Sequence, residues 1–227
     1  MDRRPPSRTP PLADRSPRER VSGDPSPIDR RDHRRTAIAR ACLERFAAEG
    51  QADARLEHLA ADAGLSRQNL LFYFRDKADL WAEAAAHATE ELYRALTRLV
   101  AGEVGPAAIR ATRRGIDEVS RILPAALAVA LDAAATAVRA SPAQQQRAAE
   151  SQATFVSTLS ASLAAPGRPT DASLRIARLA SITLLAHHRE ARAHERSGLS
   201  PALPLAADLD HAELQLVAIA RALSPRR

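Results

Sequence analysis

The chain lacks most features that mark secreted, metal-clustered or membrane-spanning proteins. Its 227 residues include one cysteine, Cys42, which excludes an internal disulfide framework and a cluster of thiolate metal ligands. No apolar run approaches the roughly 18 residues that a membrane-spanning helix needs. The amino-terminal region is rich in arginine and proline and has no apolar segment of the kind that secretory signals carry. We therefore expect a cytoplasmic protein with no membrane association.

Glycine, aromatic residues and β-branched runs are also scarce. Only 8 residues are glycine and 3% are aromatic, and no β-branched stretch has the length of a strand. Alanine and leucine dominate instead, and both favour helices. At this chain length, the composition predicts an all-α protein with a substantial core.

Positive charge exceeds negative charge, yet its placement does not mark a functional region. The chain has 33 lysine and arginine residues against 27 aspartate and glutamate residues, and its one lysine is Lys77. A basic balance permits nucleic-acid binding, but here the excess is spread over the whole chain. The function therefore has to be sought in local patterns.

Breaks in apolar periodicity divide the chain into a tail and two helical regions. Residues 1–29 carry too little apolar area to offset the entropy of ordering, so we predict a disordered tail. Residues 30–80 are predicted to form a unit of three helices. Residues 81–227 are predicted to form a larger helical bundle, which the fourth, long helix joins to that unit. About nine helices are expected, over residues 32–49, 56–63, 67–74, 77–100, 107–123, 125–140, 143–164, 170–196 and 208–223.

The segment 56–80 has the pattern of a helix-turn-helix. Two short apolar-periodic segments meet at Gly64, where a tight turn requires a positive φ. Ser66 suits the N-cap of the second helix, and Asp76 suits the N-cap of the long helix that follows. A turn of this kind presents the second helix to the major groove of DNA.

The second helix carries polar side chains beside its apolar ones. Leu70, Phe72 and Phe74 are expected to pack inward. Arginine binds guanine, and glutamine or asparagine binds adenine, through paired hydrogen bonds, while leucine contacts a thymine methyl group. Tyr73 and Lys77 suit phosphate groups. The expected DNA-contacting residues are Arg55, Ser66, Arg67, Gln68, Asn69, Leu71, Tyr73 and Lys77.

Four arginines precede this unit, and the pattern leaves their role open. Arg30, Arg31, Arg34 and Arg35 have the charge and position to follow a DNA backbone or enter a minor groove. The alternative is that they are solvated charges on the first helix.

A resemblance to TetR/AcrR-type transcriptional regulators lies in residues 63–80, which read Ala-Gly-Leu-Ser-Arg-Gln-Asn-Leu-Leu-Phe-Tyr-Phe-Arg-Asp-Lys-Ala-Asp-Leu. The family signature runs roughly Ala-Gly-Val-Ser-x-x-x-Leu-Tyr-x-x-Phe-x-x-Lys-x-x-Leu. The resemblance extends over about residues 34–81. Leu71 stands where the family usually has a backbone-contacting tyrosine, and Tyr73 is the candidate to replace that contact. The resemblance implies an N-terminal helix-turn-helix domain on a dimeric, helical ligand-sensing domain.

The family resemblance also supplies expectations for the larger region. It implies a homodimer through helices 170–196 and 208–223, so that two recognition helices read a palindromic DNA operator. It also implies a repressor that an unidentified small-molecule effector releases by shifting the spacing of those helices. Neither a cofactor nor a metal is expected. The candidate effector-binding residues are Trp81, His87, Tyr93 and Arg113.

Two other functions stay open. One is a helical interaction module that has lost DNA binding, for which Leu71 is the main argument. The other is an all-helical metal-dependent enzyme using His187, His188 and His194. No nucleophile–base pair, phosphate loop or His-Glu-x-x-His spacing accompanies these histidines, so we predict no catalytic residues.

Overall fold

The computed structural model describes residues 27–135, 140–164, 170–197 and 205–223. All regular structure in these residues is α-helical, which confirms the predicted all-α class. The ten helices are α1 (Pro27–Ala41), α2 (Leu43–Asp53), α3 (Leu56–Asp62), α4 (Arg67–Tyr73), α5 (Lys77–Val100), α6 (Pro106–Ile122), α7 (Pro124–Ala135), α8 (Pro142–Leu163), α9 (Asp171–Ser197) and α10 (Leu205–Leu223).

The count within the described residues exceeds the predicted nine because the helix expected over 32–49 is two helices. The chain breaks at Cys42 between α1 and α2, and Gly50, with φ 76°, is a kink inside α2 rather than its end. Apolar positions continue through Cys42 at helical spacing, so periodicity alone does not reveal this break. Helix α1 also begins at Pro27, inside the tail predicted over 1–29; residues 1–26 lie outside the described residues.

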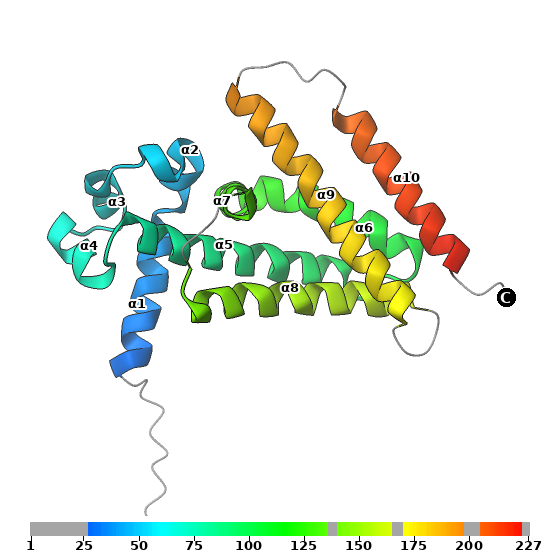
Figure 1. Ribbon diagram of the computed structural model, residues 1–227, viewed down its shortest axis with the longest axis horizontal. Helices are drawn as coiled ribbons and strands as arrows, with labels where there is room; N and C mark the ends of the chain where they lie inside the picture. Colours follow the sequence, from blue (N-terminus) through cyan, green and yellow to red (C-terminus); the bar gives the residue numbers. More distant parts are fainter. Residues whose placement is uncertain (1–26, 136–139, 165–169, 198–204, 224–227) are drawn as a thin grey trace, which may run out of the picture.

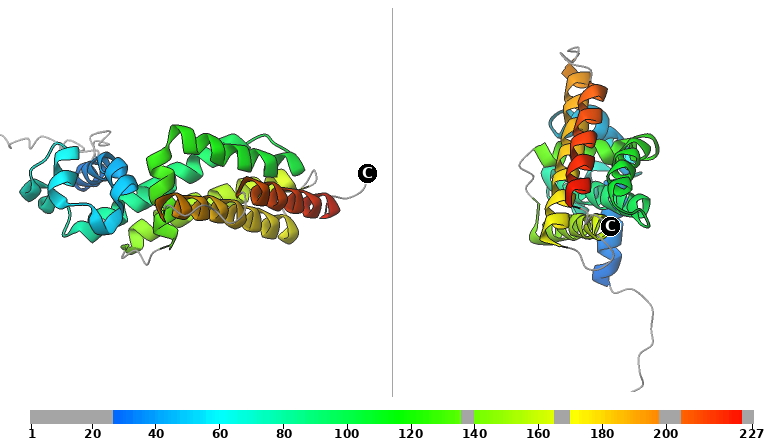
Figure 2. Two further views of the ribbon diagram at one scale, coloured as in Figure 1. Left: turned by 90° about the horizontal axis from the view of Figure 1, so that it is seen from above. Right: turned by 90° about the vertical axis from the view of Figure 1, so that its right-hand side faces the viewer.

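Helix α5 organises the fold (Figure 1). Helices α1 to α4 gather around its first turns, α8 runs alongside it, and α6 and α7 also pack against it. Its buried positions include many alanines, so neighbouring helices can approach closely on several sides. Helices α9 and α10 lie side by side on one flank of the bundle (Figure 2).

The apolar core runs without interruption from the short-helix unit into the bundle. Trp81 of α5 packs edge-to-face on Phe46 of α2, with ring centroids 5.0 Å apart, and both side chains are buried. The predicted division between residues 80 and 81 therefore falls inside a continuous core and stays a prediction. Among the described residues, no helix is both long enough and apolar enough to cross a membrane.

Candidate nucleic-acid interface

A tight turn joins α3 to α4 as the sequence predicts. Gly64 has φ 66°, the left-handed conformation that glycine adopts without steric cost. The Ser66 hydroxyl accepts a hydrogen bond from the Asn69 backbone N–H at 3.2 Å, which confirms Ser66 as the N-cap of α4. Asp76 caps α5 in the same way, by accepting from the Asp79 N–H at 2.7 Å. These local contacts fix where α4 starts and where the next helix begins.

Three side chains of α4 were predicted to pack inward; two of them do, and one does not. Leu70 and Phe74 are buried, but Phe72 is 69% exposed. A residue two positions from both of them in a helix lies about 200° around the axis, on the opposite side. Phe72 therefore joins Gln68 at the middle of the outward face. A helical wheel drawn from the sequence already places Phe72 opposite Leu70 and Phe74.

The other predicted reading residues lie around that outward face. Gln68 and Asn69 are exposed, and Leu71 is 39% exposed. The Arg67 guanidinium forms an ion pair of 3.1 Å with Glu57 of α3, and both side chains are largely exposed. Exposed pairs of this kind contribute little stability, so Arg67 can exchange Glu57 for another acceptor at small cost.

Tyr73 and Arg55 occupy the margins of the interface. Tyr73 is half-buried and packs edge-to-face on Phe72, with ring centroids 5.3 Å apart. Arg55 is exposed and directly precedes α3. Both lie on the short-helix unit, and their contacts with DNA stay predictions.

Lys77 has a structural contact that the sequence did not reveal. Its ammonium donates to the carbonyl oxygens of Ala52 at 2.7 Å and Ala54 at 3.0 Å, joining the end of α2 to the start of α5. An ammonium group has three N–H donors, so one remains for a phosphate. The predicted phosphate contact of Lys77 therefore stays open beside this structural contact.

Two arginines of α1 hold the carboxyl-terminal end of α4. Arg35 donates to the Tyr73 carbonyl oxygen, forms a 2.9 Å ion pair with Asp79 and stacks over the Phe74 ring. Arg31, one turn earlier, donates to the Phe72 carbonyl oxygen at 3.4 Å. Carbonyl groups at a helix end have no partner within the helix, and cations favour that end. The structure thus gives Arg31 and Arg35 a positioning role that the sequence left open.

A cavity of about 560 Å³ lies in the bundle between α5, α7, α8 and α9. Alanine side chains form much of its wall, and its polar lining includes Tyr93, Gln144, Gln152 and Arg189. Burial raises the pKa of Tyr93, and hydrogen bonding to Ser181 and Gln152 partly opposes that shift. The cavity can therefore accept an apolar body and offers several polar side chains to orient it.

The comparisons with known proteins place this architecture among solved structures. No protein-family model and no curated protein matches the sequence. A TetR-family transcription regulator from Marinobacter aquaeolei aligns over 88% of this chain and all of its own, with TM-score 0.55 and 17% identity. The regulator FadR from Bacillus subtilis, solved with stearoyl-CoA, aligns over 80% of this chain and 97% of its own, with TM-score 0.56 and 11% identity.

A TetR regulator from Rhodococcus sp. aligns over 86% of this chain and 97% of its own, with TM-score 0.54 and 17% identity. These alignments extend over both the short-helix unit and the bundle. The chain has the TetR-regulator fold. At these identities the likeness establishes the fold, and the function has to be argued from the site.

Only one of the four predicted effector-binding residues lines the bundle cavity of this TetR fold. That residue is Tyr93. Trp81 packs against α2, the His87 Nε2 atom lies 3.4 Å from a carboxylate oxygen of Glu91, and Arg113 forms an ion pair of 3.2 Å with Glu213 of α10. Trp81 and His87 lie on α5, which lines the cavity, whereas Arg113 lies on α6, which does not. Periodicity does not reveal which side of a helix faces a cavity when several sides are buried.

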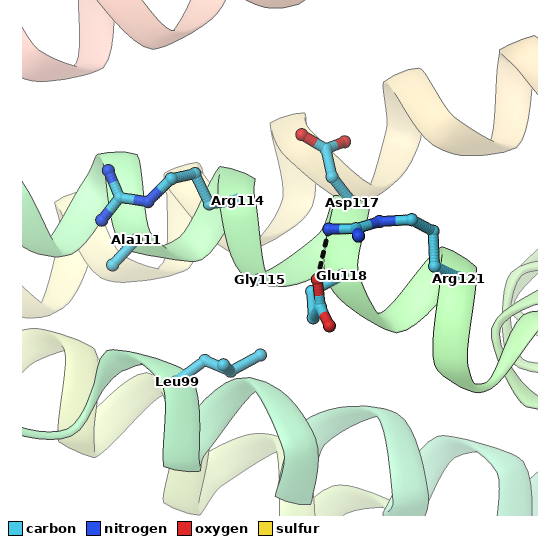
Figure 3. Close-up of a pocket in the computed structure, with 7 residues that line it drawn as sticks. All are labelled: Leu99, Ala111, Arg114, Gly115, Asp117, Glu118 and Arg121. Atoms are coloured by element: carbon cyan, nitrogen blue, oxygen red, sulfur yellow. Dashed lines mark hydrogen bonds and ion pairs between the residues drawn. The ribbon is translucent and has the colours of Figure 1, made fainter.

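A second hollow, of about 510 Å³, lies between α5 and α6 (Figure 3). Leu99 faces it from α5, and charged side chains of α6 form the opposite wall. Arg121 donates to Glu118 there. Because charges of both signs pair along this wall, the hollow does not select ligands of one charge.

A buried carboxylate joins three helices of the TetR fold. Glu83 of α5 is 5% exposed and accepts hydrogen bonds from Gln144 Nε2 at 2.8 Å, Arg147 Nη2 at 2.7 Å and the Thr36 hydroxyl at 3.3 Å. Burial alone would raise the pKa of Glu83, but these hydrogen bonds and the charges of Arg147 and Arg35 hold it below its usual range. No local sequence pattern indicates this cluster.

The lowered pKa of Glu83 predicts acid sensitivity. A carboxyl group with a lower pKa in the folded state stabilises the fold above its unfolded pKa of about 4.3, and this stabilisation is lost as pH falls through the folded value. We therefore expect Glu83→Gln to be less stable than the parent at pH 7, with the difference shrinking below about pH 4. Urea unfolding at a series of pH values measures this. A pH-independent difference would contradict the assigned carboxylate.

The histidines considered for a metal site do not form one among the described residues. His188 of α9 forms an ion pair of 3.5 Å with Asp117 of α6. The side chains of His187 and His194 lie outside the described residues. Within the described part of the chain, no group of three potential metal-binding side chains is found.

Cys42 is a buried structural thiol. Its side chain is fully buried and donates to the Leu59 carbonyl oxygen at 3.4 Å. Burial raises the pKa of the Cys42 thiol to about 12, with a further contribution from the charge of Asp62. The thiol is therefore not ionised at neutral pH, and thiolate chemistry there is disfavoured.

Proposed function

We propose that this chain is a ligand-responsive, sequence-specific DNA-binding transcriptional regulator, acting as a cytoplasmic repressor on a palindromic operator. The observation that carries this proposal is the outward face of α4. That face is uncovered and polar at its start, while the helix is capped by Ser66 and held at its end by Arg31 and Arg35. A short helix fixed at both ends and open on one face suits the major groove.

We propose different roles for the residues of the interface. Gln68 and Phe72 lie at the middle of the outward face, so we propose that Gln68 pairs with a base and Phe72 contacts a thymine methyl group. Arg67, Asn69 and Leu71 flank them and reach neighbouring bases. The proposed sugar–phosphate contacts come from Arg55, Ser66, Tyr73 and Lys77.

A homodimer through α9 and α10 is the second part of the proposal. Four large apolar side chains on these helices are exposed, by 41 to 67%: Leu179, Ile182, Leu214 and Ile219. Two of them, Leu179 and Ile219, line a hollow of about 510 Å³ between α9 and α10. Grouped apolar surface of this kind is typical of an interface, and a two-fold axis there gives two copies of α4.

The bundle cavity is the proposed effector site. FadR, which has the same fold, was solved with stearoyl-CoA, so the fold accommodates a small molecule. In this chain Arg189 is the one charged side chain among the described residues that line the cavity. The lining therefore suits a molecule with an apolar body and a hydrogen-bond-accepting or anionic group. Binding releases DNA if the effector favours a different spacing of the two α4 helices.

DNA binding is tested by fluorescence anisotropy with duplexes that tile the DNA around the gene. We expect one duplex to bind in preference to random sequence, with an affinity that falls as salt rises. In Gln68→Ala this preference should fall by about 1–3 kcal/mol, because a paired base contact is lost. Gln146→Ala, an exposed glutamine on α8, serves as the matched control and should bind like the parent.

Two results separate the proposal from its alternatives. Absence of any preferred duplex at moderate salt would favour the interaction module. A metal bound by the purified protein, with turnover that a chelator abolishes, would favour the enzyme. For the ligand response, small amphipathic anions added to the DNA complex should release it, and release by none of them would remove that part of the proposal.

A further inference from the structure

Glu83 connects the cavity to the helix that holds α4. We propose that Glu83 is a positioning residue, through which the occupancy of the cavity sets the position of the recognition helix. The inference rests on the proposed function, because it explains how an effector bound in the cavity changes a DNA-binding face. It starts from a chain of residues in which each member is hydrogen-bonded to the next, stacked on it or adjacent to it in the sequence.

The first contact lies in the wall of the cavity. Gln144 of α8 lines the cavity and is buried. Its amide nitrogen donates to Glu83 at 2.8 Å, while its amide oxygen accepts from the Ser141 backbone N–H at 2.7 Å. Both ends of the Gln144 side chain are therefore engaged. A ligand that displaces Gln144 has to break the bond to Glu83 or the capping bond of α8.

The second contact joins Glu83 to α1. The Thr36 hydroxyl donates to Glu83 at 3.3 Å, and the positive charge of Arg35, the preceding residue, acts on the same carboxylate. Arg35 in turn bonds the Tyr73 carbonyl oxygen and stacks over Phe74 at the end of α4. Gln144 and α4 are thus connected through one carboxylate and two adjacent residues of α1.

A buried carboxylate makes this connection sensitive to small movements. Glu83 is shielded from water, so each lost donor leaves a charged oxygen that solvent cannot satisfy fully. When Gln144 withdraws, Arg147 becomes the dominant partner on α8, and it also pairs with Glu90 at 3.4 Å. Arg147 and the Thr36 hydroxyl donate to the same carboxylate oxygen, Oε1, while Gln144 donates to Oε2. Loss of the bond at Oε2 lets the carboxylate turn, and this turn moves the oxygen that α1 contacts through Thr36.

A second route from the cavity to the DNA-binding unit exists through α7, which lines the cavity and packs against α2. That route is apolar packing and ends on α2 rather than on α1. The two routes therefore predict different responses when the contact between Gln144 and Glu83 alone is removed.

The test replaces Gln144 with glutamate. Gln144→Glu retains the oxygen that caps α8, because glutamate serves the capping box as well as glutamine does. It replaces the donor that faces Glu83 by a second carboxylate oxygen, so attraction becomes repulsion. Gln145→Glu is the matched control: Gln145 lines the same cavity, carries the same charge change and donates to the Ala140 carbonyl oxygen instead of Glu83.

Hydrogen exchange at neutral pH is measured on the full-length, DNA-free protein. In Gln144→Glu we expect the amides of α4 and of the second half of α1 to exchange about tenfold faster than in the parent. The first turns of α8 should exchange as in the parent, because the cap is kept. Gln145→Glu should match the parent in all three regions.

Three results would overturn the inference. They are unchanged exchange in α1 and α4, an equal increase in Gln145→Glu, and a uniform increase over the whole chain, which would show a general loss of stability. The measurement needs no DNA, so it stands apart from the proposed function. Faster exchange in α4 together with no preferred duplex would retain the connection and refute the regulator.

Discussion

Replacement of Arg35 by leucine is expected to loosen α4 and weaken DNA binding strongly. The substitution removes the donor to the Tyr73 carbonyl oxygen, the ion pair with Asp79 and the stacking on Phe74 together. We expect the free energy of unfolding to fall by about 2 kcal/mol, since a hydrogen bond to a charged group and a cation–π contact are both lost. Affinity for the preferred duplex should fall by roughly 10- to 100-fold, because α4 has to be ordered again on binding.

Arg34→Leu is the matched control for this prediction. Arg34 is the preceding residue and is exposed, so its replacement makes the same change in charge without removing a contact to α4. Its free energy of unfolding should stay within about 0.5 kcal/mol of the parent value. Chemical denaturation and anisotropy measure the two effects. Equal loss of stability in both variants would show that net charge, rather than the position of Arg35, is responsible.

Arg35→Lys separates the contacts further. Lysine keeps the positive charge but lacks the planar fork that bonds a carbonyl and a carboxylate while it stacks on an aromatic ring. We therefore expect Arg35→Lys to lose less stability and less DNA affinity than Arg35→Leu, but to fall below the parent in both. Parent-like stability and affinity in Arg35→Lys would show that a positive charge at position 35 is sufficient to hold α4.

The long helices could be predicted from the sequence because their signals are local. The helix expected over 77–100 is α5, Lys77–Val100, and its start is fixed by the Asp76 cap that the sequence displays. The turn at Gly64 and the cap at Ser66 were predicted for the same reason. Caps and turns depend on residues within three or four positions of each other, which one sequence contains in full.

The contacts that position the site could not be predicted because they join distant residues. Arg35 and Asp79 are 44 positions apart, and Glu83 and Gln144 are 61 apart. Periodicity shows which side of a helix is apolar, yet it does not show which polar side chains of different helices meet. The break at Cys42 escaped prediction because both sides of it are apolar and helical.

Phe72 shows a different kind of error, since its correct placement was accessible. Aromatic side chains near a predicted core favour burial on average, and that average misplaced Phe72. Its angular position relative to Leu70 and Phe74 decides the matter, because one side of a seven-residue helix holds only two or three residues. Phe72 stays 69% exposed although it contacts Tyr73, and a phenylalanine left this exposed favours a binding role.

Phe46→Ala is expected to give the largest loss of stability in this chain. Phe46 is fully buried and packs against Trp81 where α2 meets α5. Removal of a buried phenylalanine ring costs about 3–5 kcal/mol, through lost burial and the cavity that is left. For a chain of this size the melting temperature should fall by roughly 10 °C. Thermal unfolding followed by circular dichroism measures the change.

Phe72→Ala removes the same ring at an exposed position, so it should lower DNA affinity rather than stability. Its stability should match the parent within about 0.5 kcal/mol, whereas its affinity for the preferred duplex should fall. Phe46→Ala should bind that duplex normally at temperatures where it is folded. Loss of stability in Phe72→Ala would mean that this side chain packs inward after all.

The contact between Phe46 and Trp81 also determines how the two helical units unfold. Trp81 is the one tryptophan of the chain, so its fluorescence reports the junction, while circular dichroism reports all the helices. Because the core is continuous across the junction, the two signals should change together in the parent. Phe46→Ala removes the aromatic contact of Trp81 across the junction, so fluorescence should change at a lower temperature than helicity. Coincident transitions in this variant would show that α7 and α1 alone hold the units together.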